Sequence, residues 1–397
     1  FRPDLAGKGI VVLSRNDGCV IARNQQAKDA GIPMGAPYFQ YQHIIDKYGI
    51  QVFASNFALY ANFSMRIMRI LERYTPQVEV YSIDEAFCYN PSLCNGQDSI
   101  AVAQHIRATI LKETGITVSV GLAPTKVLAK CANRLAKTIP QSGGVFALTH
   151  TGVIDAALKQ FEVEDIWGIG SKQAKKCQAL HIRSAYQLKY YKNTALLRQR
   201  LSVVGMRIQQ ELQGVSCIQL AHIDDLKKSI RVSRSFKHAL KTEADVMGAV
   251  SAFITQATAT LRAQKSRCHV ITVYLNTDRF KDRYQQACFT LPYAQGTQSP
   301  TVLMQWVRPY VVQAIGAQYK QIGVVLSGFT PQQHIQVPLF GQKPQDPRIW
   351  NMVDALGKRF GTNTVHMATH QQYLKQQVPS LRTSPCYTTK WSDLKVV

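Results

Sequence analysis

The sequence predicts an α+β protein of several domains. Its 397 residues are too many for one hydrophobic core, and 46% of them are hydrophobic, as expected of a globular chain. Helix and strand patterns alternate between residues 56 and 147, and residues 148–218 have helical patterns throughout. From Ile230 the chain has the order strand, helix, strand, strand, helix, strand, which is that of a ferredoxin-like split βαβ domain.

The first 55 residues are expected to hold two short strands and a helix. The apolar runs 9–14 and 19–23 flank a turn with the sequence RNDG. The helical stretch that follows ends at Gly31, because glycine is the usual residue just past a helix C-terminus.

Residues 56–147 are expected to form an α/β layer. Amphipathic helices are predicted at 60–74 and 99–115, with a hairpin between them. A strand at 116–123 and a helix at 125–138 follow.

The rest of the chain divides by pattern into a helical part, a linker, the split βαβ domain and a tail. The linker is expected at 219–229, and the tail turns rich in Pro and Gln from about residue 331. One amphipathic helix is expected within the tail, at 348–360.

Charge is the strongest compositional signal. Lys and Arg number 47 against 24 Asp and Glu, a formal net charge of +23, which indicates a polyanionic partner such as nucleic acid. The alternative is a basic protein without such a partner. No apolar run is long enough to cross a bilayer and the N-terminus lacks the shape of a signal peptide, so no membrane partner is expected. Nine cysteines without a C-x-x-C pair indicate a reduced, cytoplasmic protein without zinc.

Two adjacent acids, Asp84 and Glu85, stand in the stretch VEVYSIDEAFCYN. Val78 and Val80 alternate with polar neighbours, which predicts a half-buried strand running into the acids. A regular strand would send the two carboxylates to opposite faces, so they reach one point only if the backbone turns or bulges. Carboxylates aimed at one place repel unless a cation compensates, which favours Mg²⁺. The plainer interpretation is a solvent-exposed turn.

The stretch YSIDEAF resembles the palm signature of the Y-family translesion DNA polymerases. ITVSVGLAPTKVLAKCANRLAK resembles that family's next palm strand and helix. NDGCVIARNQQAKDAGIPMG and SPCYTTKWSD are most similar to its UmuC branch, the catalytic subunits of bacterial DNA polymerase V. The resemblance implies a right-hand polymerase with these parts: fingers 1–55, palm 56–147, a helical thumb with a helix-hairpin-helix 148–218, linker 219–229, little finger 230–330 and C-terminal tail 331–397.

The resemblance also implies roles for single residues. Asp84 would be a metal ligand, and Glu85 the neighbouring catalytic carboxylate and metal ligand, with two Mg²⁺ ions expected. Lys137 and Lys28 lie where the family places basic residues on the triphosphate of the incoming dNTP. Gln25 stands where some relatives have a tyrosine, and no phosphate contact is expected of it.

Lys126 and Lys130 share the polar face of the helix that ends near Lys137. We interpret these two lysines as a solvated basic face.

Two further features suggest contacts with primer-template DNA. Gly168 and Gly170 precede a basic helix that begins near Lys172, an arrangement that lets a backbone phosphate approach main-chain N–H groups. An ordinary glycine-bearing turn is the alternative. Arg231 and Arg234 lie on the first strand of the little finger, on opposite faces unless the strand bulges, and the alternative is that they serve solubility alone.

The tail peptide IQVPLF, residues 335–340, resembles the peptide that binds bacterial polymerases to the sliding clamp. A buried edge segment is the alternative. The residues expected to contact the clamp are Gln336, Leu339 and Phe340. The resemblance further implies a processed UmuD dimer and the RecA filament as partners.

The family's third carboxylate comes from an N-terminal strand with the pattern D-x-N-x-F-Y, and this chain starts at Phe1, where that strand ends in the family. We therefore expect a gap beside the acid-bearing hairpin and impaired catalysis. The leading hypothesis is an error-prone, template-directed DNA polymerase subunit of the bacterial SOS response. The alternatives are a catalytically inactive DNA- and clamp-binding protein and a metal-dependent nuclease.

Overall fold

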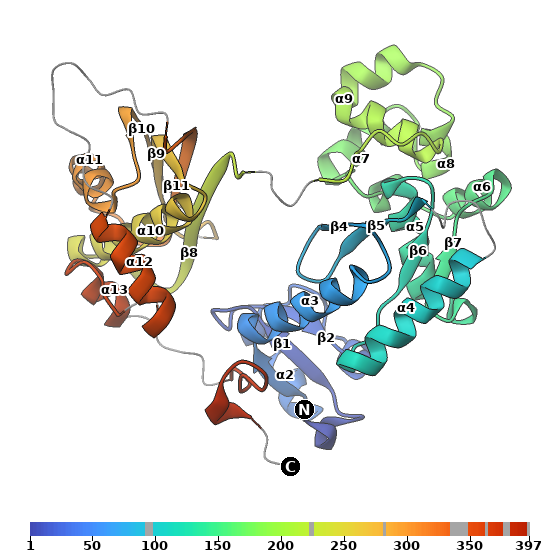
Figure 1. The fold of residues 1–397 in the computed structure, drawn as a ribbon, viewed down its shortest axis with the longest axis horizontal. Coiled ribbons are helices and arrows are strands. Elements are labelled where there is room, and N and C mark those ends of the chain that lie inside the picture. The colour runs from blue at the N-terminus through green and yellow to red at the C-terminus, as the bar shows by residue number, and fades with distance from the viewer. Residues whose placement is uncertain are drawn as a thin grey trace. The chain divides into compact units, whose positions relative to one another are not determined.

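The computed structural model describes residues 1–91, 98–221, 226–280, 283–333, 348–361, 364–375 and 382–394 (Figure 1). The chain divides into two compact units. The first comprises residues 1–56 and 226–385, and the second comprises residues 57–225 and 386–397. Among the described residues, no helix is both long enough and apolar enough to span a membrane.

The N-terminal part of the first unit is a three-stranded sheet with two helices. The strands lie in the order β2-β1-β3, with β1 antiparallel to β2 and parallel to β3. Buried Val11, Leu13 and Ile45 belong to its core. The elements are β1 (Ile10–Leu13), β2 (Val20–Arg23), α1 (Gln25–Asp29), α2 (Tyr38–Lys47) and β3 (Gln51–Ala54).

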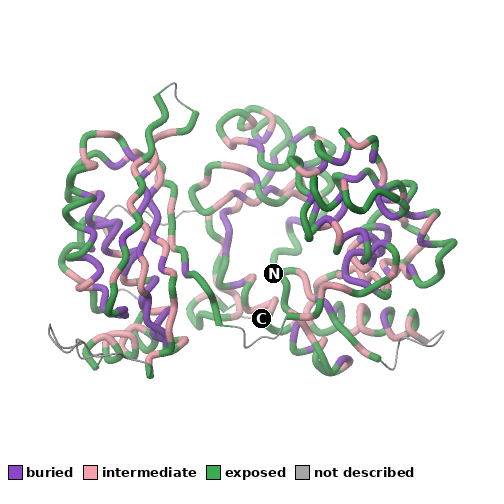
Figure 2. Tube along the Cα trace, turned by 90° about the horizontal axis from the view of Figure 1, so that it is seen from above, coloured by how far each residue is buried: buried purple, intermediate pink, exposed green. Residues whose placement is uncertain are grey.

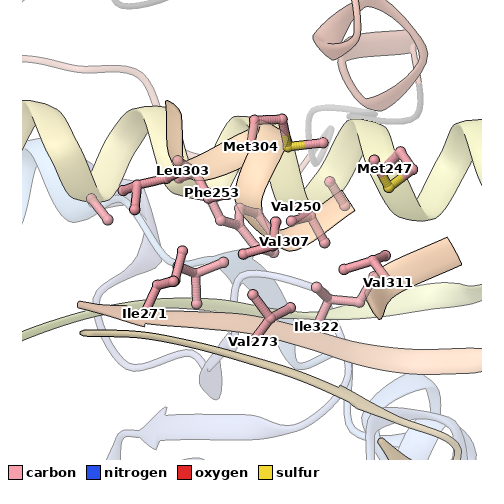
Figure 3. Packing of buried hydrophobic residues seen from close by; sticks show 14 of the residues in the cluster. Met247, Val250, Phe253, Ile271, Val273, Leu303, Met304, Val307, Val311 and Ile322 are labelled. Carbon is pink, nitrogen blue, oxygen red and sulfur yellow. The ribbon is translucent and has the colours of Figure 1, made fainter. Parts of the chain in front are cut away.

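The larger part of the first unit confirms the predicted order of strands and helices. Its four antiparallel strands lie in the order β10-β9-β11-β8. Helix α10 packs against β8, β9 and β11, and Figure 3 shows Phe253 and Val250 of α10 above Ile271 and Val273 of β9. The elements are β8 (Ser229–Leu240), α10 (Glu243–Ala263), β9 (Ser266–Asn276), β10 (Gln286–Thr297), α11 (Pro300–Gln313) and β11 (Tyr319–Pro331).

The C-terminal residues are more structured than the sequence indicated. Helix α12 (Arg348–Phe360) has the predicted bounds. Helix α13 (His370–Lys375) was not predicted, and it packs on α10 with Tyr373 in the hydrophobic core. Six residues with the sequence HQQYLK are too few to show helical periodicity.

The second unit begins with the predicted alternation of helices and strands. In the part of the chain that the structure describes, its strands form two separate pairs, β4 with β5 antiparallel and β6 with β7 parallel. The strand expected at 116–123 is shorter than predicted, because only three of those residues pair as β6. The elements are α3 (Phe57–Leu71), β4 (Gln77–Val80), β5 (Ala86–Tyr89), α4 (Asp98–Thr114), β6 (Val120–Leu122), α5 (Lys126–Thr138) and β7 (Val145–Ala147).

Residues 148–218 are helical, as predicted. Their core includes Leu158, Leu188 and Leu197, all fully buried, and it continues into α5 through Leu128. In α6 the buried residues Ile154, Ala157 and Leu158 have the spacing of one helical face. Figure 2 shows buried and exposed positions following one another along the chain. The helices are α6 (Thr151–Lys159), α7 (Ser171–Gln178), α8 (Ala185–Lys189) and α9 (Thr194–Leu212).

Candidate active site

The two acids lie in the tight turn that joins β4 to β5. The backbone N–H groups of Tyr81 and Ser82 both donate to the carbonyl oxygen of Glu85, each at 3.0 Å. These two hydrogen bonds reverse the chain over residues 81–85. Asp84 and Glu85 therefore leave the strand geometry at the turn, as the sequence required if both are to serve one site.

Asp84 is exposed to solvent and is held by a neighbouring hydroxyl. The Oγ atom of Ser82 donates to Oδ1 of Asp84 at 2.5 Å, and the Asp84 N–H donates back to that Oγ at 3.2 Å. This local pair of hydrogen bonds restricts the carboxylate to few orientations.

Glu85 is paired with a lysine from helix α5. The Nζ atom of Lys130 donates to Oε1 of Glu85 at 2.6 Å, and the two side chains are 24% and 35% exposed. The same ammonium lies 5.6 Å from the ring centroid of Tyr81. The interpretation of Lys130 as part of a solvated face is therefore wrong, because its charge is directed at the acid-bearing turn.

Lys126, one helical turn before Lys130, is buried and ion-paired with Glu79 of β4. Its Nζ also donates to the carbonyl oxygen of Gln219 at 2.8 Å, while the N–H of Ala221 donates to Oε2 of Glu79 at 2.8 Å. The prediction of a solvated Lys126 is wrong for a physical reason. Residues four apart lie on one face of a helix, and this face of α5 packs against the hairpin.

The buried ion pair of Lys126 and Glu79 also explains why the burial pattern predicted for β4 is wrong. Val80 is 47% exposed, whereas Glu79 is turned inward beneath Lys126. The expected alternation of buried valines in β4 is therefore not observed. A carboxylate with a buried cationic partner can occupy an inward position that an alternation rule assigns to an apolar residue.

An aromatic cluster, which the sequence analysis missed, supports the turn. Trp167 donates its indole N–H to the hydroxyl of Tyr81 at 3.0 Å, and its ring lies 5.6 Å from that of Phe87 between centroids. Lys126 lies 5.0 Å from the centroid of the Phe87 ring. The cluster joins the hairpin to the loop that precedes α7.

The two lysines assigned to the triphosphate are exposed. Lys137 lies in the last turn of α5, the helix that also carries Lys126 and Lys130. Lys28 lies in the last turn of α1, in the first unit.

Gly168 and Gly170 form the approach to helix α7. Gly168 has φ +95°, a left-handed conformation that favours glycine, and a Cβ atom there would lie 2.9 Å from Cδ1 of Ile208. Gly170 is the N-cap residue of α7, has no side chain to satisfy the first N–H groups, and has open space where a Cβ would be. Lys172 is exposed in the first turn.

The two arginines of β8 lie on opposite faces, as the strand period predicts. Arg231 is exposed, and its Nε donates to the Tyr274 hydroxyl at 2.9 Å. Arg234 is half-buried, with its guanidinium 5.9 Å from the ring centroid of Tyr373 in α13. The clamp-binding residues Gln336, Leu339 and Phe340 lie outside the described residues.

The oxygen donors of the turn fit a magnesium ion. Magnesium binds through one or two carboxylates and takes its remaining ligands from substrate phosphates and water. Asp84 and Glu85 would supply the carboxylates, and no group of three or more His, Cys, Asp or Glu able to hold a metal occurs among the described residues. The pair thus offers two protein ligands that substrate and water would complete.

Comparison with protein families gives three matches along the chain. Residues 1–134 match the impB/mucB/samB family, and residues 227–339 match the C-terminal domain of that family. Residues 347–397 match a domain of unknown function.

Curated relatives match over nearly the whole chain. Protein UmuC of Salmonella typhimurium is 35% identical over 409 residues, which cover 99% of this chain and 95% of that protein. Protein MucB of Escherichia coli is 33% identical over 409 residues, 100% of this chain and 95% of its own length. A DNA polymerase IV of Pelotomaculum thermopropionicum is 26% identical, with coverage of 92% and 90%.

Solved structures share the fold. A Y-family DNA polymerase chimera of Dbh and Dpo4 matches with TM-score 0.65 and 22% identity over 83% of this chain and 94% of that chain. DinB from Sulfolobus solfataricus matches with TM-score 0.51 and 22% identity, covering 82% of this chain and 93% of its own. The right-hand polymerase fold predicted from the sequence is thereby confirmed. By these family matches and full-length relatives, the chain belongs to the impB/mucB/samB family, the UmuC-like branch of the Y-family DNA polymerases.

Proposed function

We propose that this chain is a DNA-directed DNA polymerase that performs translesion synthesis, with its catalytic carboxylates in the β4–β5 turn. The observation that carries the proposal is the turn itself. It holds Asp84 and Glu85, adjacent in sequence, outside the two strands, in a chain that is 35% identical to protein UmuC over nearly its full length. Two adjacent carboxylates outside a regular strand are what a magnesium-dependent nucleotidyl transfer requires of the protein.

Asp84 and Glu85 would hold Mg²⁺, with Ser82 fixing the orientation of the Asp84 carboxylate. A pair of such ions would activate the primer 3′-hydroxyl and stabilise the leaving pyrophosphate. Lys130 sets the position of Glu85 before the metal binds, because its ammonium holds one of the two carboxylate oxygens.

The exposed lysines have a separate task. Lys137 and Lys28 would each place a positive charge on the triphosphate, where negative charge develops during transfer. The contribution of the two lysines is electrostatic, and neither has to act as a general base.

DNA would be held by its phosphates and not by its bases. The uncapped N–H groups at the start of α7 can receive a backbone phosphate, with Gly168 and Gly170 permitting its approach and Lys172 adding charge. On β8 we assign the phosphate contact to exposed Arg231. Arg234 was also expected to bind DNA, but its place against Tyr373 makes it the weaker candidate.

Three partner proposals rest on the sequence resemblance. Gln336, Leu339 and Phe340 would bind the sliding clamp, and Leu339→Ala with Phe340→Ala should abolish that binding in a pull-down with purified clamp. A processed UmuD dimer and the RecA filament are the other proposed partners, which would place the protein in the SOS response of a bacterial cytoplasm.

Primer extension with Mg²⁺ and all four deoxynucleotides tests the catalytic proposal. Asp84→Ala and Glu85→Gln should each lower the rate at least about a hundredfold, because each removes a metal ligand. Asp46→Ala is the matched control, since Asp46 is an exposed acid on α2. Fluorescence anisotropy with labelled primer–template should show unchanged DNA binding for all three variants.

The same assay on the chain preceded by the family's D-x-N-x-F-Y strand tests the expectation about the third carboxylate. If Asp84→Ala extends primers as fast as the parent protein in both contexts, the assignment of the turn is wrong. If neither context extends primers while DNA binding persists, the polymerase proposal itself fails. The comparisons do not favour that non-catalytic alternative or the nuclease alternative, since the named relatives include DNA polymerases.

A further inference from the structure

Helix α13 and the turn before it are built into the surface of the β8–β11 domain. The hydroxyls of Thr369 and Ser251 are 2.7 Å apart, and Nε2 of His370 lies 3.3 Å from the hydroxyl of Thr255. Tyr373 is 5% exposed, and its ring meets that of Phe253 edge-on at 5.5 Å between centroids. This end of the C-terminal region is therefore anchored by both polar and apolar contacts.

The backbone at this anchor approaches α10 closely. A Cβ atom on Gly248 would lie 2.9 Å from the carbonyl oxygen of Thr369, so only glycine permits this spacing. The C-terminal segment thus packs closely on α10 at Gly248, where the helix has no side chain.

A second attachment lies seven positions after α13, on the sheet of the N-terminal part. The N–H of Ala54, the last residue of β3, donates to the carbonyl oxygen of Arg382 at 2.9 Å. Thr383 forms a parallel bridge with Ala54. Because β3 is an edge strand of the order β2-β1-β3, residues 382–384 can pair with its free edge, and they do so at its last residue, Ala54.

Side chains reinforce the edge pairing. The amide nitrogen of Asn56, a residue only 2% exposed, donates to the carbonyl oxygens of Ser384 at 2.8 Å and Pro385 at 3.2 Å. The guanidinium of Arg382 lies 4.6 Å from the ring centroid of Tyr38 in α2. The segment is therefore recognised by a buried amide and an aromatic ring as well as by the strand edge.

The β1–β3 sheet and the β8–β11 domain also contact each other directly, and like charges lie near that contact. The side-chain amide of Asn16, in the β1–β2 turn, donates to the carbonyl oxygen of Ser235 in β8 at 2.5 Å. Burial, and then the nearby charge of Arg234, lower the pKa of Arg15, the neighbour of Asn16. The like charges of Arg15 and Arg234 oppose this contact, and the C-terminal segment adds a second link between the two parts.

We propose that residues 369–375 and 382–385 are the two attached ends of an intramolecular strap that ties the β8–β11 domain to the β1–β3 sheet. Its two attachments are α13 on α10 and the Arg382–Pro385 segment on β3. Seven residues from Lys375 to Arg382 reach at most about 25 Å, so anchoring α13 keeps the second segment close to β3. The resulting effective concentration is in the millimolar range, high enough for a short segment with weak intrinsic affinity to stay bound.

The strap gives an architectural role to part of the region matched by a domain of unknown function. This inference does not depend on polymerase activity, because both attachments are contacts of the chain with itself. Failure of the strap experiment below would leave the assignment of Asp84 and Glu85 untouched.

Hydrogen exchange at the amide of Ala54 reports the second attachment. In the full chain this amide should be protected, since it donates to Arg382. A chain that ends at Lys375 should exchange it about tenfold faster, while the amides of β11 keep their protection. A peptide of residues 382–394 added to the shortened chain should restore protection at millimolar concentration and not at micromolar concentration.

Coupling between the attachments distinguishes a strap from two independent contacts. Tyr373→Ala loosens the α13 anchor, and it should speed exchange at Ala54 severalfold by lowering the effective concentration of the second segment. Lys390→Ala is the control, because its side chain is 64% exposed in the same C-terminal region.

Two results would overturn the proposal. Equal protection of Ala54 in the full and shortened chains would show that the edge pairing does not form in solution. Unchanged exchange at Ala54 in Tyr373→Ala would show that the attachments are uncoupled. If the chain that ends at Lys375 also loses protection of the β11 amides, the full-length variant Asn56→Ala replaces it as the test. The strap predicts that this variant exchanges the Ala54 amide faster while the β11 amides stay protected.

Discussion

The ammonium of Lys130 lies 2.6 Å from Oε1 of Glu85, the carboxylate next to Asp84 in the β4–β5 turn. Both side chains are partly solvent-exposed, so this ion pair is worth about 0.5–1 kcal/mol and can be broken without unfolding the turn. If Glu85 is a metal ligand, as proposed, the lysine holds an oxygen that the metal ion would use, and the two cations compete for one carboxylate.

This competition predicts that Lys130→Met lowers the Mg²⁺ concentration needed for half-maximal primer extension. An ion pair of about 0.5–1 kcal/mol corresponds to a two- to fivefold change in metal affinity. Binding of Mn²⁺ measured by electron paramagnetic resonance gives a readout that does not require turnover. Lys112→Met, an exposed lysine of α4, is the control. A higher metal requirement in Lys130→Met would mean that the lysine assists metal binding and does not compete with it.

Lys126 and Glu79 predict a different result, because this pair is almost fully buried, with side chains 9% and 11% exposed. Lys126→Met leaves the Glu79 carboxylate without its cation in a poorly solvated site, which should lower the free energy of unfolding by about 3 kcal/mol. The double variant Lys126→Met with Glu79→Leu should regain most of that loss, since no buried charge remains unpaired.

Urea unfolding of the two single variants and the double variant gives the coupling energy directly. Additive losses in the double variant would show that the two charges do not stabilise each other. Catalysis is a separate matter, and a stable Lys126→Met protein should still show the metal dependence of the parent.

The fold was predictable where periodicity is strong. The bounds of α12 and the strand–helix order of residues 229–331 follow from apolar spacing that the structure preserves. For the acid pair the sequence predicted a turn or bulge on the condition that both acids serve one site, and the structure has a turn there. Local chemistry was sufficient in these places.

The partners of the acids were not predictable. Lys126 and Lys130 look like a solvated stripe on an isolated helix, and only the packing of α5 against the hairpin shows that each meets a carboxylate 45 or more residues away in sequence. The same applies to Trp167 and to the C-terminal strap. Non-local pairing between residues of ordinary type leaves no periodic signal in a single sequence.

Gly168 and Gly170 predict contrasting results from one type of substitution. Gly168→Ala places a methyl group 2.9 Å from Ile208 and forces alanine to adopt φ +95°, so it should lower the free energy of unfolding by about 1–2 kcal/mol. Gly170→Ala meets open space at an ordinary φ of −84°, and its effect on unfolding should be small.

DNA binding should respond differently from stability at these two positions. The Gly170 methyl group would stand where a phosphate approaches the first N–H groups of α7, so Gly170→Ala should weaken primer–template binding severalfold. Anisotropy titrations at two salt concentrations, beside urea unfolding of each variant, make the comparison. Unchanged DNA binding in Gly170→Ala would remove the start of α7 from the proposed DNA-binding surface.

His370 predicts a pH dependence of the α13 anchor. Burial, and then the neighbouring charge of His366, lower the pKa of His370 below its ordinary value of 6.5, although a hydrogen bond with Ser251 opposes the shift. The folded anchor thus favours the neutral imidazole, and the unfolded segment binds the proton more readily. Its stabilising contribution is fully present above pH 6.5 and is lost as the pH falls through the lowered pKa.

Exchange of the α13 amides, corrected for the intrinsic pH dependence of exchange, should therefore speed up severalfold between pH 7.5 and pH 5. His370→Gln should abolish this added pH dependence, because glutamine does not titrate. His150→Gln, an exposed histidine before α6, should leave it unchanged. The groups that face His370 from α10 are the Thr255 hydroxyl and the backbone of Ser251, and the ring of His366 stacks on it at 6.1 Å between centroids. If His370→Gln keeps the full pH dependence, His370 is not the titrating group and this prediction is wrong.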